Sequence, residues 1–503
     1  MTLWKPICTV TLGSLALVGT ALILPLATRG QQNMDRKNFI DSTNGQGISR
    51  TITTKGTFEL NTLNNPFFRP LGTNGRTCAT CHPTSQGMTI SPDYASQVFD
   101  ATQGLDPLFA AVDGANNPDA DMSTPEARRS NCSMLLTKGL IRIGLALPAN
   151  CEFTLEAVDD PYHYAGAREI SCFRRPLPST NLRFLATVMW DGRERPAGSS
   201  VTDALKSQIK DAVSGHMQGI VPPTDTEISQ ILDFETHLYT TQIFDNSIGN
   251  IDTFQIGAGP QNLIDLLFHP GINDAFGLIR NKQPFNPNVF TFYTASDPDF
   301  DFNHNRPRPS SQNGAPPPRN GGPQSNRGQQ SNGRPPQPLP LTPPQQARFS
   351  VARGENLFNT RQFDITDVPG LNDVVGKTRI TGTCSSCHSV PRVGSNALPL
   401  LLNTGVADGL LRTADLPLYT LRNKKTGAAM QTTDPGAAMT SGKWADIGKF
   451  KVPSLRALET QSPYFHNGFS GDLLDIVNFY DNRFLIGLTD QEKADLKAFL
   501  TTL

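Results

Sequence analysis

Two stretches of the sequence share one short pattern, Cys78-Ala-Thr-Cys81-His82 and Cys384-Ser-Ser-Cys387-His388. With 8 Cys and 8 His among 503 residues, chance would supply about 0.002 matches to C-x-x-C-H, so two matches indicate a function. A structural zinc site needs four ligands, and neither motif has a second Cys or His pair close downstream. A redox dithiol does not need the histidine that follows.

The C-x-x-C-H spacing is instead the one that covalent attachment of a c-type haem requires. Each thiol adds across a vinyl group of the porphyrin, and the adjacent imidazole then ligates the iron. We therefore expect two covalently bound haems, each with one iron ion. The expected attachment and ligand residues are Cys78, Cys81 and His82 for one haem and Cys384, Cys387 and His388 for the other.

Three further cysteines, Cys132, Cys151 and Cys172, lie in the body of the chain, whereas Cys8 lies in the N-terminal segment. In an oxidising compartment Cys132 and Cys151 would close a short loop, and such a disulfide stabilises a protein by about 2–4 kcal/mol. Cys172 could replace either partner. The alternative is that these residues are buried thiols, because pairing cannot be deduced from spacing.

The N-terminus has the features of an export signal. Lys5 precedes an apolar run that ends near Leu26, and small residues precede a cleavage site after Gly30. We expect residues 1–30 to be a cleaved signal peptide. An uncleaved anchor is the alternative, since about 20 apolar residues can span a bilayer. Either one places the body of the protein outside the cytoplasm, and we expect it in the periplasm.

Composition divides the rest of the chain in two. Residues 301–347 are rich in Pro, Gln and Asn and poor in apolar side chains, so they cannot bury enough surface to offset the entropy of ordering them. We expect a disordered linker there, between an N-terminal haem domain (residues 36–300) and a C-terminal one (residues 348–503). The net charge of −1 gives no electrostatic reason to expect a nucleic-acid partner. The sequence carries no signal for the oligomeric state.

The elements that must position the two motifs are expected to be helices. Apolar residues recur at helical spacing in residues 346–358, ahead of the second motif. Thr489 and Glu492 form a capping-box pattern before an apolar stretch at the C-terminus. A helix before the motif and another at the domain end is the layout of c-type cytochromes. We therefore predict a mainly α protein of two cytochrome c-like domains with long loops and insertions.

The two halves also repeat one another outside the motifs. Residues 178–183 (PSTNLR) are followed by residues 188–193 (VMWDGR), and residues 453–456 (PSLR) by residues 463–468 (PYFHNG). An apolar stretch with helical spacing follows each turn. We infer the duplication of one haem-binding unit, with a longer first copy.

On these segments the chain resembles a known family. The resemblance covers both motifs, MWDGR, FKVPSLRALETQSPYFHNGF, DIVNFY and GLTDQEKADLKAFL. The family is the bacterial dihaem cytochrome c peroxidase superfamily, which includes the dihaem enzyme that matures the quinone cofactor of methylamine dehydrogenase. Residues 90–170 and 220–345 take no part in the resemblance.

The resemblance implies that one haem reacts with hydrogen peroxide and that the other stores or relays an electron. Electrons would enter at the C-terminal haem from a small soluble donor, a cytochrome c or a cupredoxin. They would pass to the N-terminal haem, where peroxide binds opposite His82. Two other functions stay open: an electron-transfer cytochrome without catalysis, and a peroxide-dependent oxidase of a protein or organic substrate. A calcium ion between the domains is common in the family, but its ligands cannot be assigned here.

Trp190 matches the family tryptophan that lies between the two haems, where an indole shortens each electron-transfer step. The alternative is a core tryptophan ahead of a turn. Asp191 and Arg193 follow it in the sequence. They either hydrogen-bond the haem propionates or tie the turn.

Tyr480 falls where the family places the second ligand of the C-terminal haem. A phenolate oxygen in that place would stabilise ferric and higher iron states, whereas a Met would raise the reduction potential. Met430 and Met439 follow His388 within reach of an ordinary cytochrome loop, so these residues, or an open site, are the alternatives.

His216 falls where the family usually carries a Glu that moves protons. A His can do the same work, because it can deprotonate peroxide and then protonate the departing oxygen. It could instead bind the iron or face solvent. His163 is another possible ligand of the N-terminal haem, with a surface histidine as the alternative. His466 matches a family position near the C-terminal haem, where it is either functional or structural.

Overall fold

The computed structural model describes residues 38–194, 198–253, 256–279, 283–293, 300–301, 306–307 and 341–503. The expected signal peptide, residues 1–30, lies outside these ranges, as does most of the expected linker, residues 301–347. No helix in the described ranges is both long and apolar enough to cross a membrane.

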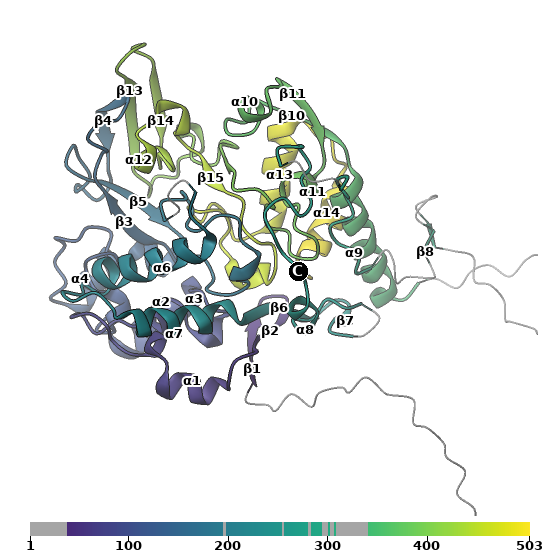
Figure 1. Cartoon of the computed structure of the whole chain (residues 1–503), viewed down its shortest axis with the longest axis horizontal. Helices are drawn as coiled ribbons and strands as arrows, with labels where there is room; N and C mark the ends of the chain where they lie inside the picture. Colours follow the sequence, from purple (N-terminus) through teal and green to yellow (C-terminus); the bar gives the residue numbers. More distant parts are fainter. Residues whose placement is uncertain are drawn as a thin grey trace, which may run out of the picture. The chain divides into compact units, whose positions relative to one another are not determined.

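Helices are found along both halves of the chain (Figure 1). Those before the linker are α1 (Phe58–Asn64), α2 (Cys78–Cys81), α3 (Pro92–Thr102), α4 (Pro125–Asn131), α5 (Ser133–Lys138), α6 (Val201–Asp211), which runs into a π-helical turn (Ala212–His216), α7 (Asp225–Thr236) and α8 (Gln261–Ile264). Those after it are α9 (Pro343–Thr360), α10 (Asn372–Val375), α11 (Cys384–Cys387), α12 (Ala438–Ser441), α13 (Leu473–Phe484) and α14 (Asp490–Leu500).

The strands are short, and every pair between them is antiparallel. They are β1 (Phe39–Asn44), β2 (Gly47–Thr53), β3 (Ile141–Leu145), β4 (Phe153–Asp159), β5 (Ile170–Arg174), β6 (Leu238–Asp245), β7 (Gly249–Asn250), β8 (Phe300–Asp301), β9 (Arg306–Pro307), β10 (Phe363–Thr366), β11 (Arg379–Gly382), β12 (Leu401–Leu402), β13 (Leu418–Asn423), β14 (Ala429–Thr432) and β15 (Phe450–Lys451). The sheet orders are β1-β2-β6-β7, β14-β13-β4, β3-β5, β10-β11, β12-β15 and β8-β9.

The prediction of a mainly α protein is wrong, because the described chain is a mixture of helices and small antiparallel sheets. Several of the strands lie where the sequence resembles no cytochrome: β4 lies within residues 90–170 and β6 within residues 220–345. β6 reads LYTTQIFD and its partner β2 reads GISRTIT. Both are rich in the β-branched and aromatic residues that suit a pleated, half-buried surface.

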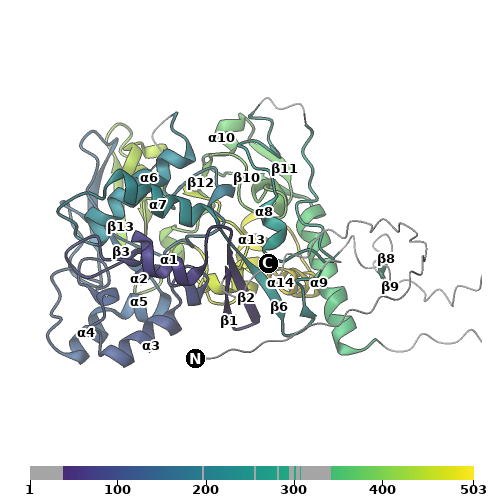
Figure 2. The same ribbon diagram turned by 60° about the horizontal axis from the view of Figure 1, so that its bottom comes forward.

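The helices expected at the two ends of the C-terminal unit are confirmed as α9 and α14, which lie against each other (Figures 1 and 2). They cross at Gly354, where an added Cβ would lie 1.9 Å from the carbonyl oxygen of Asp495. Only a residue without a Cβ permits this approach. The expected capping box is also present, because the Thr489 N–H donates to the Glu492 carboxylate at 2.8 Å and the Glu492 N–H to the Thr489 hydroxyl at 3.2 Å.

The inserted residues 90–170 pack against the C-terminal half of the chain. β4 pairs with β13 along six residue pairs, from Phe153 opposite Asn423 to Asp159 opposite Leu418. In Figure 1 the β13–β14 hairpin accordingly lies beside β4. One apolar core contains buried residues from both segments. The insertion therefore holds together parts of the chain that are far apart in the sequence.

The three cysteines outside the motifs are buried thiols that form no disulfide in the described chain. Cys132, Cys151 and Cys172 all belong to the core that the insertion shares with β13. Burial raises the pKa of Cys132 to about 12, and thiols in apolar surroundings are chemically inert. The structure thus matches the alternative without a disulfide.

Candidate functional site

The two C-x-x-C-H motifs have the same local structure. Each pair of cysteines begins and ends a one-turn helix, α2 or α11, and the preceding threonine caps it in a reciprocal capping box, Thr77 before α2 and Thr383 before α11. The N–H of the motif histidine donates to the carbonyl of the first cysteine, at 3.0 Å for His82 and 3.1 Å for His388. Two thiols and one imidazole are thus held together on a single turn.

The motif thiols do not have the properties of a redox dithiol. Burial raises the pKa of Cys81 to about 11 and that of Cys384 and Cys387 to about 12. Catalytic dithiols need a lowered thiol pKa, because the thiolate is the nucleophile. The environment therefore favours the interpretation of these cysteines as attachment sites.

Each motif histidine hydrogen-bonds a backbone carbonyl through Nδ1, and Pro453 adds a second backbone hydrogen bond at His388. Nδ1 of His82 lies 3.0 Å from the carbonyl oxygen of Met88, and Nδ1 of His388 lies 2.7 Å from that of Gly394. A carbonyl only accepts hydrogen bonds, so Nδ1 carries the proton and Nε2 keeps the lone pair that can ligate a metal. Burial lowers the pKa of both histidines to about 4. Both acceptors lie six residues after the histidine, which extends the internal repeat.

Each motif opens into a cavity of its own. The first cavity is lined by Cys78, Cys81 and His82 and contains about 1490 Å³ of space between protein atoms, part of it open to solvent. The second cavity is lined by the residues of the second motif and contains about 1690 Å³. The thiols and the imidazole of each motif thus line space that a cofactor could occupy.

The two cavities share a wall, and Trp190 belongs to it. Trp190, the segment from Arg175 to Pro178, Lys451 and Pro453 line both cavities. The indole N–H of Trp190 donates to the carbonyl of Arg175 at 2.8 Å, and the N–H of Lys451 donates to the carbonyl of Trp190 at 2.8 Å. One hydrogen bond thus holds the indole ring and the other holds the backbone of Trp190 in the wall between the two cavities.

Three buried cations on the cavity walls have no carboxylate partner within the described part of the chain: Arg175, Lys451 and Arg456. The ammonium group of Lys451 donates to the carbonyl of Thr187 at 3.4 Å, and Nε and Nη1 of Arg456 have no hydrogen-bond partner among the described residues. Burial lowers the pKa of Lys451 to about 8, that of Arg456 to about 9 and that of Arg175 to about 10. Buried cations need an anion, and the propionates of a haem would supply one. The residues of both cavities thus fit that cofactor.

His216 lines the first cavity, on the π-helical turn that follows α6. Its Nδ1 bonds to the carboxylate of Asp113, and Asp113 pairs with the guanidinium of Arg76. The His216 carbonyl accepts hydrogen bonds from Asn74 Nδ2 at 2.9 Å and from Arg76 Nη1 at 3.2 Å. The structure therefore brings His216 into one cavity with His82, as the resemblance implied. Its role in catalysis stays a prediction.

Glu235 is a buried carboxyl group on the first cavity that the sequence reasoning missed. It lies on α7, is 5% exposed, and its Oε2 has no hydrogen-bond partner in the ranges that the structure describes. Burial raises the pKa of Glu235 to about 7, although a hydrogen bond with Ser179 acts in the opposite direction. A signal was present in the sequence, because Glu235 follows Ile228 and Ile231 at helical spacing and so falls on the apolar face of its helix.

We predict that Glu235→Gln makes stability less dependent on pH. The pKa of Glu235 is about 7 in the folded protein, against a usual 4.5, so folding favours its protonated form. Stability is then greatest below the usual pKa and falls by on the order of 3 kcal/mol as the pH rises to the folded value. Gln keeps the shape and cannot ionise. Between pH 5 and pH 8 the free energy of unfolding of the variant, measured in urea, should therefore rise relative to that of the native protein. Glu126→Gln, on the exposed face of α4, is the control. The prediction is refuted if the free energies of unfolding of Glu235→Gln and the native protein differ by the same amount at pH 5 and at pH 8.

Tyr480 lines the second cavity together with His388, whereas the two alternative methionines do not. Tyr480 lies on α13, with its ring stacked on that of Phe484 at 6.2 Å between centroids. Met439 is buried in the core of the insertion, and Met430 is exposed on β14. Burial raises the pKa of Tyr480, so its phenol stays protonated unless a metal ion takes the oxygen.

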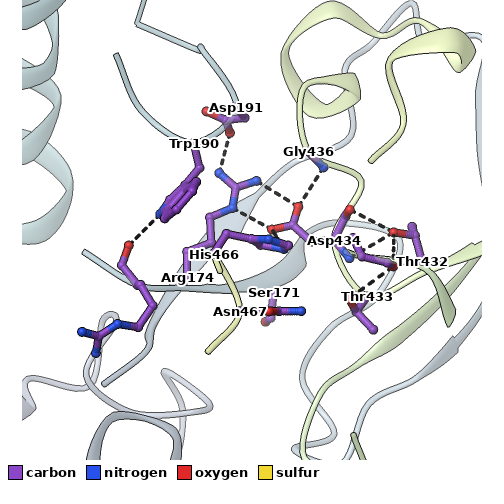
Figure 3. Close-up of polar contacts among 12 residues, drawn as sticks. Ser171, Arg174, Trp190, Asp191, Thr432, Thr433, Asp434, Gly436, His466 and Asn467 are labelled. Atoms are coloured by element: carbon purple, nitrogen blue, oxygen red, sulfur yellow. Dashed lines mark hydrogen bonds and ion pairs between the residues drawn. The ribbon is translucent and has the colours of Figure 1, made fainter. Parts of the chain in front are cut away.

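A buried ion network adjoins Trp190 (Figure 3). Arg174 Nη1 binds Asp191 Oδ2 at 2.5 Å, and its Nε and Nη2 bind the two carboxylate oxygens of Asp434 at 2.7 and 2.9 Å. His466 Nε2 lies 3.8 Å from Asp434 Oδ2, and its ring lies 6.2 Å from the ring of Trp190. Burial opposes ionisation of Asp434, but Arg174 holds its pKa at about 2. Asp191 thus ties the Trp190 turn to β5, which matches the second interpretation of that residue.

The remaining sequence candidates lie in different places. Arg193 lines the first cavity and contacts Asp191 at 3.2 Å. His466 lines the second cavity, whereas His163 is exposed and lies on neither cavity wall. No group of three or more His, Cys, Asp or Glu residues in the described ranges is placed to hold a metal ion, so ligands for a calcium ion stay unassigned.

The two motifs thus line separate cavities with a tryptophan in their common wall, and the similar proteins are named cytochrome-c peroxidases. No family model matches the chain. The chain is 34% identical over 135 residues to the cytochrome-c peroxidase IdrP2 of Denitromonas iodatirespirans, covering 24% of this chain and 36% of that protein. It is 42% identical over 69 residues to the cytochrome-c peroxidase IdrP1 of the same organism, covering 12% and 18%.

A third relative is the cytochrome-c peroxidase IdrP1 of Pseudomonas sp. strain SCT, which is 30% identical over 140 residues, covering 24% of this chain and 36% of that protein. The chain thus spans well under half the length of each of these relatives. Their shared name supports a cytochrome-c-peroxidase-like family for this chain.

Proposed function

We propose that the protein is a periplasmic peroxidase with two c-type haems that reduces hydrogen peroxide. Hydrogen peroxide, two protons and two electrons give two molecules of water. The observation that carries this proposal is that the two C-x-x-C-H motifs open into separate cavities and that Trp190 lines both. The similarity to proteins named cytochrome-c peroxidases supports the same class of activity.

In this proposal several residues would hold each haem. The motif cysteines would form the thioether bonds, and His82 and His388 would ligate iron through Nε2. Tyr480 would be the second ligand of the C-terminal haem. Lys451 and Arg456, buried without carboxylate partners among the described residues, bind propionates. The haem iron would supply the redox chemistry between the mostly apolar walls of each cavity.

The chain's own residues then move the protons and guide the electrons. His216 takes a proton from peroxide in the first cavity and returns it to the departing oxygen. Trp190 divides the path between the cavities into two shorter steps. A small soluble donor of the cytochrome c or cupredoxin type would supply the electrons on the side of the second cavity, where the C-terminal haem would be held.

In the proposed organisation the chain has two haem-carrying parts and a connecting segment. Residues 36–300 and 348–503 each carry one haem, and residues 301–347 join them. Residues 1–30 direct the chain to the periplasm, where c-type haems are attached. The presence of two motifs with matching local geometry supports the dihaem type.

Tyr480 favours a second candidate function, the peroxide-dependent oxidation of a protein or organic substrate. A tyrosine oxygen on iron stabilises oxidised states, and Tyr480 lines the second cavity beside His388. Such a centre could hold an oxidising equivalent for a substrate that binds outside. Steady-state assays that compare several reductants with organic substrates separate the two candidates.

Mass spectrometry of the purified protein tests the attachment directly. We expect the mass of the processed chain plus two haems. The variant Cys384→Ala/Cys387→Ala is expected to lose one haem and keep the other, since each motif serves its own cavity. The bare chain mass, or a single haem on the native protein, contradicts the proposal.

The optical spectrum of the ferric protein tests the peroxide site. An enzyme is expected to show a high-spin band and a shift of the Soret band when peroxide is added. A purely low-spin spectrum that peroxide does not change would instead favour an electron-transfer cytochrome, with His216 bound to the iron.

A further inference from the structure

We infer that Asp113 is a positioning residue for His216: its carboxylate decides which ring nitrogen of that histidine is available in the first cavity. This inference rests on the proposed function of the same site. It also gives a part in the reaction to the inserted residues 90–170, which lie outside the segments that carry the family resemblance.

The geometry comes from three separate segments of the chain. Arg76 precedes the first motif, Asp113 lies in the insertion, and His216 ends the π-helical turn. Backbone carbonyls hold the guanidinium of Arg76: its Nε donates to the carbonyl of Pro107 at 2.7 Å and its Nη2 to that of Leu108 at 2.8 Å. Its Nη1 is left to pair with one oxygen of Asp113, and the other oxygen of Asp113 bonds to Nδ1 of His216.

The charge of Asp113 follows from this arrangement. Burial opposes ionisation, but the nearby Arg76 cation and the bonds from His216 and Arg76 lower the pKa of Asp113 below its usual value. The carboxylate is therefore ionised at neutral pH, and an ionised carboxylate only accepts hydrogen bonds.

An accepting Asp113 determines the proton positions on His216. Nδ1 must carry the proton that it donates, so Nε2 keeps its lone pair. Because His216 lines the first cavity, Nε2 is the atom that can take a proton from a molecule bound there. Once His216 is protonated, the negative charge of Asp113 stabilises the imidazolium, as a carboxylate does for the histidine of a catalytic triad.

A purely structural role is the alternative, in which Asp113 only neutralises buried Arg76. The two roles differ in one respect: only a positioning residue affects reactions that need a proton acceptor in the cavity. Hydrogen cyanide must lose its proton to bind ferric haem, whereas carbon monoxide binds ferrous haem without any proton transfer.

The experiment therefore compares cyanide and carbon monoxide association in the full-length holoprotein by stopped flow. We expect Asp113→Asn to slow cyanide association by about 10²-fold, the usual scale for losing a proton acceptor, because an amide can donate to Nδ1 and leave the proton on Nε2. Carbon monoxide association stays within about twofold. Asp113→Glu keeps a carboxylate and recovers part of the cyanide rate. Asp121→Asn, an exposed position of the same insertion, changes neither rate.

Two results would overturn the inference. One is unchanged cyanide association in Asp113→Asn alongside slow association in His216→Ala. The other is an equal loss of cyanide and carbon monoxide association, which indicates a structural defect. If cyanide association responds as expected but peroxide turnover is absent in the native protein, the proposed function fails and the positioning role stands.

A second measurement covers the case in which Asp113→Asn does not fold. Nitrogen NMR of the ferrous carbon monoxide complex reports the tautomer of His216, assigned by its loss in His216→Ala. We expect a protonated Nδ1 and an unprotonated Nε2 in the native protein. The opposite tautomer contradicts the inference without any Asp113 variant.

Discussion

Replacing His216 by alanine is expected to lower the rate of hydrogen peroxide reduction by about 10²-fold or more, the usual loss when a general acid–base group is removed. Alanine removes the nitrogen that takes the proton from peroxide and returns it to the leaving oxygen. His216 is not part of either C-x-x-C-H motif, so the haem content stays unchanged. Steady-state assays with a fixed reductant, combined with a haem determination on each preparation, measure the effect.

The matched control for this variant is His269→Ala. His269 is an exposed histidine whose Nδ1 contacts the carbonyl of Pro270, and it lines neither cavity. We expect full turnover from it. Unchanged turnover in a fully loaded His216→Ala protein would remove His216 from the mechanism. An equal loss in both variants would point to a general effect on the protein instead.

The parts of the site that depend on short spacing could be predicted from the sequence alone. Covalent attachment needs two thiols and an imidazole on one turn, and C-x-x-C-H encodes that turn within five residues. Both motifs accordingly have matching helices, caps and histidine contacts. Trp190, His216 and Tyr480 followed from family resemblance, and each lies on a cavity wall.

The residues that were missed have partners distant in sequence. Asp113 meets His216 across 103 residues and Arg76 across 37, and nothing in the local sequence marks an Asp that serves another segment. Arg174 likewise reaches Asp434 across 260 residues. Such contacts depend on the packing of the insertion, which the family pattern does not contain. Glu235 differs, because a carboxyl group on an apolar helix face was visible in the periodicity.

The fold class was mispredicted for a related reason. The helices that carry or flank the second motif could be predicted, because capping and helical spacing are local properties. The sheets are made by pairs such as β2 with β6 and β4 with β13, whose strands are far apart in the chain. Neither the motifs nor the cytochrome resemblance specifies those pairings, so a prediction built on both underestimates the strands.

A second large effect is expected from Arg174→Met, which should lower the free energy of unfolding by about 3–5 kcal/mol, the usual cost of removing one partner from a buried ion pair. Methionine keeps most of the volume of the side chain but leaves Asp434 without its cation. Beside Arg174 the pKa of Asp434 is about 2, against a usual 3.8, so this stabilisation is present above the usual value and is lost as the pH falls toward 2. The difference between the two proteins in urea unfolding should therefore be large at pH 7 and shrink below pH 4.

Arg422→Met is the matched control, because the same substitution removes an ion pair at the surface. Arg422 pairs with Glu156 at 2.6 Å across β13 and β4, with side chains 46% and 39% exposed. Water screens such a pair, so its loss costs little stability. Asp434→Asn added to Arg174→Met should recover part of the lost stability, since it removes the uncompensated charge. Equal losses of unfolding free energy for Arg174→Met and Arg422→Met would contradict the prediction that the buried ion pair stabilises the protein more than the surface pair does.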